Sequence, residues 1–199
     1  MTRFVAILGS ATPPGRLSRT VRQAVERAYT RGHQTDLLDL SQLSLPFAGA
    51  ASAQAGDTVA VIDVLSAADA VLFASPVYRA SLPGILKNLL DLTPLEALLG
   101  KPCGILAMGT SAHHYLGVDR HLRDILTWFG AMTAPTSVYL TNEDFEQGVP
   151  AAHVARELDE LIDTLAVFAD SARDWVHGPG PAPLAAKKVE PAGPPSQPL

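Results

Sequence analysis

The sequence is poor in cysteine, in charge and in long apolar runs, and each shortage excludes a class of protein. Cys103 is the single cysteine among 199 residues, so an internal disulfide is impossible. No cluster of cysteine and histidine has the spacing of a zinc site. No stretch approaches the roughly 18 consecutive apolar residues of a membrane-spanning helix. The apolar start is also too short for a signal peptide. These absences predict a protein of the cytoplasm, with no membrane partner.

The charge balance disfavours nucleic acid as a partner. Lysine and arginine number 15 against 20 aspartate and glutamate residues, which gives a formal net charge of −5. Phosphate backbones require a basic surface, so nucleic-acid binding is not expected. In contrast, 47% of the residues are hydrophobic and only 18% are charged, a composition that favours a sizeable buried core over a disordered chain.

Composition changes sharply near Gly178. The 22 residues from Gly178 to Leu199 hold 7 of the 16 prolines, and such a stretch forms neither helix nor sheet readily. We therefore predict one domain over residues 1–177 and a Pro/Gly-rich tail over residues 178–199. The tail is expected to be flexible or extended, and packing along a neighbouring subunit is the alternative.

Apolar runs alternate with helical patterns through the predicted domain. Buried strands are expected at Phe4–Leu8, Gln34–Leu40, Ala70–Ala74, Cys103–Met108 and Ser137–Leu140. Strands separated by helices predict an α/β fold, with a parallel sheet covered by helices on both faces. Five strands suit the flavodoxin-like doubly wound order 2-1-3-4-5, in which a ligand binds at the carboxyl ends of the strands.

The loop after the first strand has the composition of an anion site. It leads into a helix N-terminus, where free N–H groups and the helix dipole favour negative charge. The dinucleotide and triphosphate motifs G-x-G-x-x-G and G-x-x-x-x-G-K-[ST] do not occur. Hydroxyls and a guanidinium suit a compact phosphomonoester instead, and here they come from Ser10, Thr12, Arg16 and Ser18. An ordinary turn with Ser18 as the helix cap is the alternative.

The loop after the third strand offers flat apolar surface. Pro76 directly follows the strand and fixes the chain direction, while Val77 and Tyr78 supply apolar surface with a polar tip. Such a surface suits an aromatic ring.

Together these loops resemble those of the flavodoxin-like NAD(P)H-dependent FMN reductases, above all the reductases of two-component sulfonate-utilisation systems. The resemblance runs from about Phe4 to Val138. It rests on Gly9-Ser10…Arg16…Ser18, Ser75-Pro76-Val77-Tyr78, Pro83-Gly84-x-Leu86-Lys87-Asn88-x-x-Asp91 and Gly100-Lys101-Pro102.

The resemblance implies a flavin site made of three loops. Ser10, Arg16 and Ser18 correspond to positions that grip the FMN phosphate in the family. The isoalloxazine ring would pack on the second loop, at Pro76, Val77, Tyr78 and Arg79.

A third loop, at Gly109 and Thr110, corresponds to contacts with the pyrimidine edge of the flavin. Here Met108-Gly109-Thr110 replaces the Thr-Gly-Gly that is usual in the family. Backbone N–H groups near Gly109 and Thr110 are expected to stabilise negative charge toward flavin N1. Some members carry an additional tyrosine in the following helix, and none stands at Asp119–His121.

The implied activity is reduction of FMN by NADPH or NADH, with hydride transfer from nicotinamide C4 to flavin N5. The flavin carries this chemistry, so no catalytic side chain is expected. No metal is expected either, because adjacent His113 and His114 point apart and lack a third ligand. The reduced FMN would then leave for a partner monooxygenase, react with oxygen or reduce a bound acceptor, and the sequence does not choose among these fates. A quinone- or azo-type reductase with bound flavin is the alternative, followed by a flavodoxin-like electron carrier.

Two further expectations concern the core and the assembly. Cys103 opens an apolar strand and is expected to be an inert core thiol. The helix after Gly84 carries more leucine than one sheet face needs, which predicts a homodimer or homotetramer through this region. The leucines concerned are Leu86, Leu89, Leu90, Leu95, Leu98 and Leu99.

Overall fold

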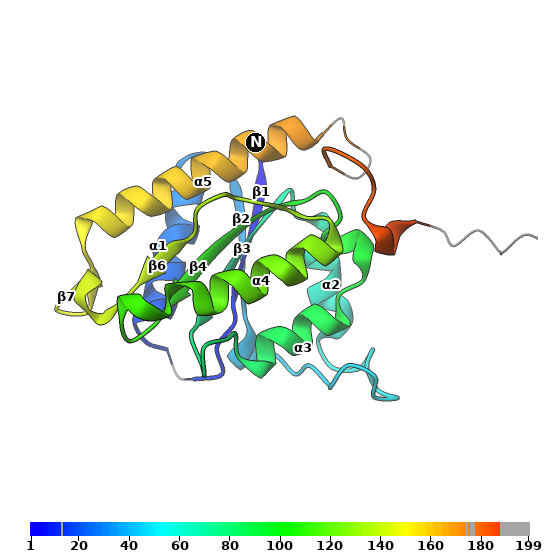
Figure 1. The fold of residues 1–199 in the computed structure, drawn as a ribbon, viewed down its shortest axis with the longest axis horizontal. Helices are drawn as coiled ribbons and strands as arrows, with labels where there is room; N and C mark the ends of the chain where they lie inside the picture. Colours follow the sequence, from blue (N-terminus) through cyan, green and yellow to red (C-terminus); the bar gives the residue numbers. More distant parts are fainter. Residues whose placement is uncertain (13, 174, 176–177, 188–199) are drawn as a thin grey trace, which may run out of the picture.

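The computed structural model describes residues 1–12, 14–173, 175 and 178–187, and its centre is a parallel β-sheet between two helical layers (Figure 1). The strands are β1 (Arg3–Leu8), β2 (Gln34–Asp39), β3 (Ala70–Pro76), β4 (Pro102–Met108), β5 (Met132–Thr133) and β6 (Val138–Leu140). Their order is β2-β1-β3-β4-β5, and β6 also pairs with β4. The predicted fold class and strand order are confirmed.

The helices are α1 (Arg16–Thr30), α2 (Thr58–Ala67), α3 (Gly84–Leu92), α4 (Tyr115–Phe129) and α5 (Ala152–Ala172). A short antiparallel hairpin of β7 (Phe145–Glu146) and β8 (Val149–Pro150) lies between β6 and α5. The described residues contain no helix that is long and apolar enough to cross a membrane.

Where one last strand was predicted, the structure has two short strands, β5 and β6. β5 pairs with Pro102 and Cys103 at the start of β4, whereas β6 pairs with the end of β4 from Leu106. Pro135 lies between them, and a proline has no N–H to donate to a ladder. The prediction of one strand over Ser137–Leu140 therefore found β6 and missed β5.

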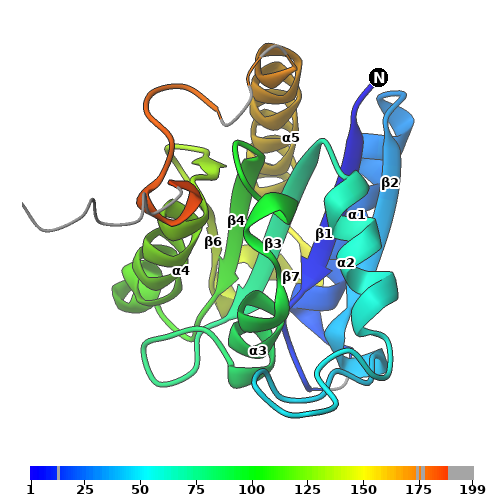
Figure 2. The ribbon, with the colours of Figure 1, turned by 90° about the vertical axis from the view of Figure 1, so that its right-hand side faces the viewer.

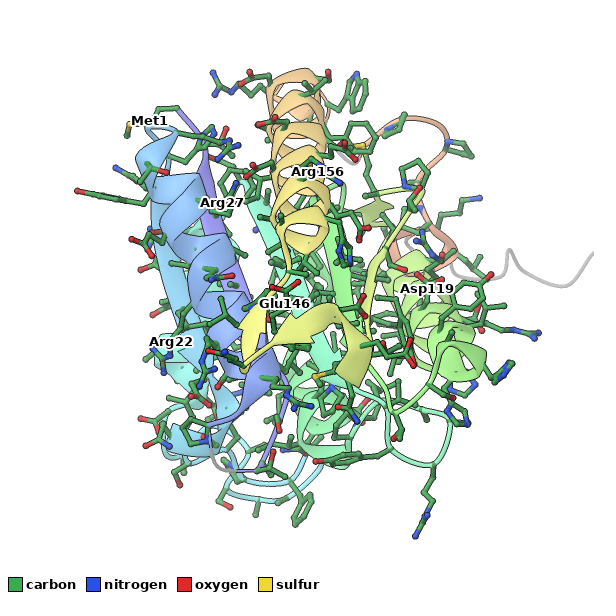
Figure 3. The ribbon with its side chains drawn as sticks, turned by 90° about the vertical axis from the view of Figure 1, so that its left-hand side faces the viewer. Met1, Arg22, Arg27, Asp119, Glu146 and Arg156 are labelled. Carbon is green, nitrogen blue, oxygen red and sulfur yellow. The ribbon has the colours of Figure 1, made fainter. Side chains whose placement is uncertain are left out.

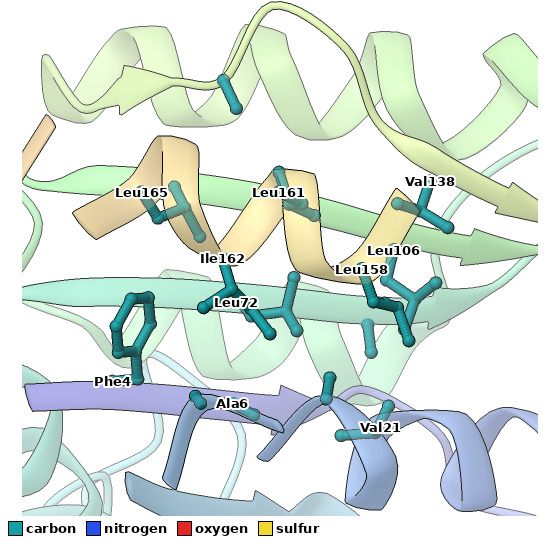
Figure 4. Packing of buried hydrophobic residues seen from close by; sticks show 14 of the residues in the cluster. Phe4, Ala6, Val21, Leu72, Leu106, Val138, Leu158, Leu161, Ile162 and Leu165 are labelled. Atoms are coloured by element: carbon teal, nitrogen blue, oxygen red, sulfur yellow. The ribbon is translucent and has the colours of Figure 1, made fainter. Parts of the chain in front are cut away.

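Both faces of the sheet are buried, which explains the continuous apolar runs of its strands. Phe4, Ala6 and Leu8 of β1 face α1 and α5, whereas Val5 and Ile7 face α2, α3 and α4. This alternation is the two-residue period of a strand. Figure 4 shows the first of these layers, in which Phe4 and Leu72 lie opposite the apolar side of α5.

Charged side chains tie the two helices of that layer together. The guanidinium groups of Arg27 in α1 and of Arg31, just after the end of that helix, both pair with Asp159 in α5, the second at 2.7 Å. Figure 3 views this face, with α1 and α5 side by side. The hydrogen bonds from Arg27 hold the pKa of the Asp159 carboxyl below its ordinary value. The ion pairs therefore fix the position of α1, whose first turn carries part of the predicted site.

The leucine surplus expected on α3 is not available to a partner. Leu86, Leu89, Leu90 and Leu98 are buried in the layer that also holds α2 and α4. That reason for an oligomer was wrong, because the sequence pattern did not show how deeply α3 and the following turn pack into their own core.

The described part of the predicted tail, residues 178–187, packs against its own chain. Pro183 lies so close to Gly130 at the end of α4 that a Cβ on that glycine would be 2.7 Å away. Gly178 likewise approaches Gly100, before β4. This contact lies at the amino ends of the strands, and residues 188–199 of the predicted tail lie outside the described residues.

Candidate flavin site

Three loops meet where the parallel strands end, at the lower side of Figure 2. Each loop begins with a backbone N–H that donates to the end of a neighbouring strand. Gly9 donates to Ala74 at 2.8 Å, Val77 to Met108 at 2.8 Å, and Gly109 to Leu140 at 2.9 Å. The loops that were predicted from sequence therefore start side by side along one edge of the sheet.

A cavity of about 160 Å³ lies at the first of these loops. It is lined by Leu8, Ser10, Thr12, Gly15, Arg16, Leu17, Ser18, Pro76 and Met108. All four residues predicted for a phosphate thus surround one cavity, together with the first residue predicted for a ring. Ligand pockets commonly measure roughly 300–1,000 Å³, so this cavity suits a phosphate and its linker better than a whole flavin nucleotide. We call it the phosphate end of the site.

Hydroxyl groups line the phosphate end and are held by one another and by the backbone. Ser10 and Ser18 are each only 6% exposed. The hydroxyls of Ser10 and Thr12 share a hydrogen bond of 2.8 Å. The Ser18 hydroxyl accepts from the Gly15 N–H and donates to the Gly15 carbonyl, both at 2.9 Å. The N-cap of α1 is Gly15, and Ser18, three residues on, closes a capping box by accepting from the Gly15 N–H; a capping role for Ser18, the alternative expectation, is therefore present in this form.

The start of α1 is suited to an anion. The first helical hydrogen bond runs from the Arg19 N–H to the Gly15 carbonyl, at 3.1 Å. The N–H groups before Arg19 have no partner within the helix, and the positive end of the helix dipole lies there as well. With the hydroxyls and the Arg16 guanidinium, this donor set fits a phosphomonoester.

Arg16 is held by a segment that sequence reasoning missed. Its Nη1 donates to Oδ1 of Asn142 at 2.6 Å, and its guanidinium lies 5.5 Å from the centre of the Phe145 ring. Arg19 also donates to the carbonyl of Gly148. These residues follow β6, so their position after the last strand of the sheet was the available signal.

The second loop contains a strained two-residue hairpin. Tyr78 and Ser81 exchange both backbone hydrogen bonds, at 2.8 and 3.0 Å. Between them Arg79 and Ala80 have φ values of 52° and 60°. Positive φ at both central residues defines a type I′ turn, which usually contains glycine or asparagine. Each non-glycine residue in this region costs about 1–2 kcal/mol, so the surrounding structure must hold the turn in place.

Helix α4 holds this hairpin. A Cβ on Gly117 would lie 3.1 Å from the Ala80 carbonyl oxygen, so the helix approaches the turn closely. The Nδ1 of His121 shares a hydrogen bond of 2.8 Å with the Ser81 hydroxyl. Tyr78 is 43% exposed, and Arg79 is exposed at the turn. Tyr78 thus lies at the edge of the sheet rather than in the core.

The third loop depends on a glycine and a tyrosine. A Cβ on Gly109 would lie 2.0 Å from the Tyr139 hydroxyl, which donates to the Ser111 carbonyl at 2.8 Å. Burial raises the pKa of the Tyr139 hydroxyl. Tyr139, on β6, was not predicted from sequence. We call this loop and the hairpin the ring end of the site.

One expected donor is already in use. The Gly109 N–H donates to Leu140, so it is not available to stabilise charge on a flavin. That part of the expectation was wrong, because Gly109 still continues the hydrogen-bonding pattern of β4. Thr110, which is exposed, is the remaining residue of the pair.

Cys103 lies away from this site. It is fully buried in β4, and its burial raises the pKa of the thiol to about 12. The expectation of an inert core thiol is thereby confirmed. In the described part of the chain, no three His, Cys, Asp or Glu residues cluster as metal ligands would.

This strand order, with an anion cradle between β1 and α1, defines a flavodoxin-like nucleotide-binding protein. The chain belongs to the NADPH-dependent FMN reductase family, whose model matches residues 2–146. The predicted family is confirmed. The protein is an oxidoreductase that reduces FMN with a nicotinamide nucleotide.

Named relatives agree with this membership. The chain is 34% identical over 147 residues to an FMN reductase (NADPH) of Pseudomonas aeruginosa, covering 72% of this chain and 79% of the relative. It is 36% identical over 148 residues to the NADH-dependent FMN reductase SfnF of Pseudomonas fluorescens, covering 72% and 78%. The apo structure of the NADH:FMN oxidoreductase EMOB is similar with a TM-score of 0.72 and 28% identity, covering 86% of this chain and 90% of that one.

Proposed function

We propose that the protein binds FMN as an exchangeable substrate, with the phosphate at the start of α1 and the ring on the second and third loops. The cavity that unites the four predicted phosphate residues with Pro76 and Met108 carries this proposal. Its size leaves the ring outside the enclosed part of the site. A ring held there would be accessible to a nicotinamide, and we take this as support for exchange of the flavin.

The proposal assigns each predicted residue to one end of the site. Phosphate contacts fall to Ser10, Thr12, Arg16 and Ser18, and the ring packs on Pro76, Val77, Tyr78 and Arg79. Gly109 and Thr110 border its pyrimidine edge. We further propose residues 1–177 as the flavin-binding domain and residues 178–199 as an appendage to it.

When bound, FMN would supply the hydride chemistry, with its ring nitrogen N5 as the acceptor. The protein's own contribution is binding and orientation. Buried hydroxyls and the arginine fix the phosphate, which anchors the far end of the ligand. The Thr110 N–H is the candidate donor toward N1, since the Gly109 N–H is bonded to Leu140. Tyr78 and Val77 supply the apolar surface against the ring.

The reduced FMN would pass to a partner monooxygenase. The resemblance of the three loops to those of reductases from two-component systems supports this. Relatives are named for NADH and for NADPH, and we propose that the protein accepts both.

Arg16→Ala tests the phosphate assignment. We expect FMN binding to weaken by about 1.5–3 kcal/mol, the scale of a hydrogen bond to a charged group. Riboflavin, which has no phosphate, should bind almost as well as it does to the wild type. Fluorescence titrations of both flavins measure the two affinities. Equal losses for FMN and riboflavin would contradict the assignment.

The colour of the purified protein tests whether FMN is exchangeable. A colourless protein that oxidises NAD(P)H only when free FMN is added is the expected result. A yellow protein that NAD(P)H bleaches, and that keeps its flavin through gel filtration, would favour the bound-flavin quinone- or azo-type reductase instead.

We also propose a homodimer or homotetramer that forms through the region of α3, together with the adjoining face of α4. With the leucines of α3 buried, the support comes from Trp128, which is 58% exposed beside a groove between these helices. Ile125, which is half-buried, also lines this groove. A monomer mass in light scattering at micromolar concentration would contradict this assembly.

A further inference from the structure

The segment that follows β6 reaches across the rim of the phosphate end. Asn142 and Phe145 belong to it, and both contact Arg16, Asn142 from a sequence distance of 126 residues. We propose that Asn142 and Phe145 are positioning residues, which hold the Arg16 guanidinium where the FMN phosphate binds. This inference rests on the proposed role of Arg16.

The contact with Asn142 leaves Arg16 able to bind a phosphate. A guanidinium has five N–H donors, and the bond from Nη1 to Oδ1 of Asn142 uses one of them. Donors on Nε and Nη2 remain, and two parallel donors are what a phosphate accepts best. Asn142 is also neutral, so Arg16 keeps its positive charge for the dianion. The carboxamide therefore orients the arginine without neutralising it.

Phe145 supports the same orientation from a second direction. The guanidinium carbon lies 5.5 Å from the ring centre, within the range of a cation–π contact. Arg16 is exposed, and a long exposed side chain loses rotamer freedom when it binds a ligand. Holding it between an amide and a ring removes part of that loss before the ligand arrives.

The segment itself is held in a defined shape. The carboxylate of Asp144 accepts from the Thr141 N–H at 2.6 Å and from the Thr141 hydroxyl at 2.9 Å. Its other oxygen lies 2.9 Å from Nε2 of His153 in α5. These bonds close the turn that carries Asn142. The hairpin beyond it lies beside the first turns of α1, near the labelled Glu146 in Figure 3.

A double-mutant cycle tests the inference on the full chain. Asn142→Ala, Arg16→Ala and the double variant are titrated with FMN and with riboflavin. We expect Asn142→Ala to raise the Kd for FMN about tenfold and to leave the Kd for riboflavin unchanged. The double variant should bind FMN no more weakly than Arg16→Ala alone, because Asn142 acts through Arg16.

Further variants separate positioning from folding. Phe145→Leu keeps apolar bulk but removes the ring face, and should also weaken FMN more than riboflavin. Glu143→Ala changes an exposed neighbour and should alter neither affinity.

Three results would overturn the inference. Tighter FMN binding by Asn142→Ala would show that the amide competes with the phosphate. Equal weakening of both flavins, or independent effects of the two substitutions, would show that the segment does not act through Arg16. If Arg16→Ala itself fails to distinguish FMN from riboflavin, the proposed role of Arg16 is wrong as well.

Discussion

The phosphate end and the ring end of the site are built by different means. At the phosphate end, the buried hydroxyls of Ser10 and Ser18 and the start of α1 form a local unit within a few residues of one another. At the ring end, the hairpin around Arg79 and Ala80 is strained and exposed. It keeps its shape through contacts from α4, while Tyr139 supports the neighbouring loop.

The difference means that the two ends can be altered separately. Changes at the phosphate end should affect FMN and spare riboflavin. Changes at the ring end should affect both flavins equally, because both carry the same ring. The ratio of the two affinities is therefore the quantity that tests the comparison.

Gly109→Ala should have the largest effect, because it disturbs the ring end of the site and so weakens the binding of both flavins. The new Cβ would meet the Tyr139 hydroxyl at 2.0 Å, so Tyr139 must leave its bond to Ser111 or the loop must move. Such overpacking costs about 1–3 kcal/mol. We expect FMN and riboflavin to lose affinity by the same factor, measured by fluorescence titration, and the protein to melt at a lower temperature.

A second substitution sharpens this result. Tyr139→Phe removes the hydroxyl that the new methyl would meet, so the double variant should recover part of the lost affinity. If Gly109→Ala weakened only FMN, the third loop would belong to the phosphate end and the comparison would fail.

Tyr78→Ala should weaken flavin binding less than Gly109→Ala does, and should change the stability of the protein little. Because Tyr78 is 43% exposed, we expect the free energy of unfolding to fall by less than about 1.5 kcal/mol. A core tyrosine would instead cost about 3–5 kcal/mol. Affinity for both flavins should drop about tenfold, equivalent to roughly 1.4 kcal/mol. Chemical denaturation and flavin titration of the same variant decide between these roles, and a large stability loss with unchanged affinity would exclude Tyr78 from the site.

Asp144→Asn changes the turn that carries Asn142 at the phosphate end, and it has the smallest expected effect. The effect is a loss of unfolding free energy that depends on pH. Burial raises the pKa of the Asp144 carboxyl, but hydrogen bonds from Thr141 and the nearby His153 outweigh it, and the net pKa is lowered. The unfolded chain therefore binds this proton more readily. The stabilisation is complete above the ordinary pKa of about 3.9 and is lost as the pH falls through the lowered value.

We expect Asp144→Asn to cost about 1 kcal/mol of unfolding free energy at neutral pH, the scale of one hydrogen bond. Urea denaturation at several pH values should show this difference shrinking toward zero in acid. Glu143→Gln, at an exposed neighbour, is the matched control. A difference that stays constant with pH would show that the Asp144 charge contributes nothing to the turn.

Local patterns were sufficient to predict most of the fold. The apolar runs and their spacing located β1 to β4 and β6, because a doubly covered parallel sheet makes each strand continuously apolar. β5 escaped because two residues carry no recognisable period. The leucines of α3 misled for a related reason, since helical spacing shows which residues share a face but not what covers that face.

The site was predictable where it is local and was missed where it is not. Ser10, Thr12, Arg16 and Ser18 lie within one loop and the helix turn that follows it, and the structure brings them to one cavity. Asn142 contacts Arg16 at the start of α1 from far along the chain. Tyr139 likewise contacts Ser111 in the third loop. These contacts arise because β6 pairs with β4 in the sheet. No single sequence motif encodes that pairing.

The position of β1 inside the sheet, between β2 and β3, has a consequence for synthesis of the chain on the ribosome. Phe4, Ala6 and Leu8 pack against α5, and Leu158 follows Leu8 by 150 residues. At about 5–20 residues per second, that face of β1 waits roughly 8–30 s for its helix to be made. Throughout that interval α1 is the one helix of this layer that has been made, so the part of the strand surface that α5 will cover stays exposed, and aggregation during translation is the hazard that this topology carries.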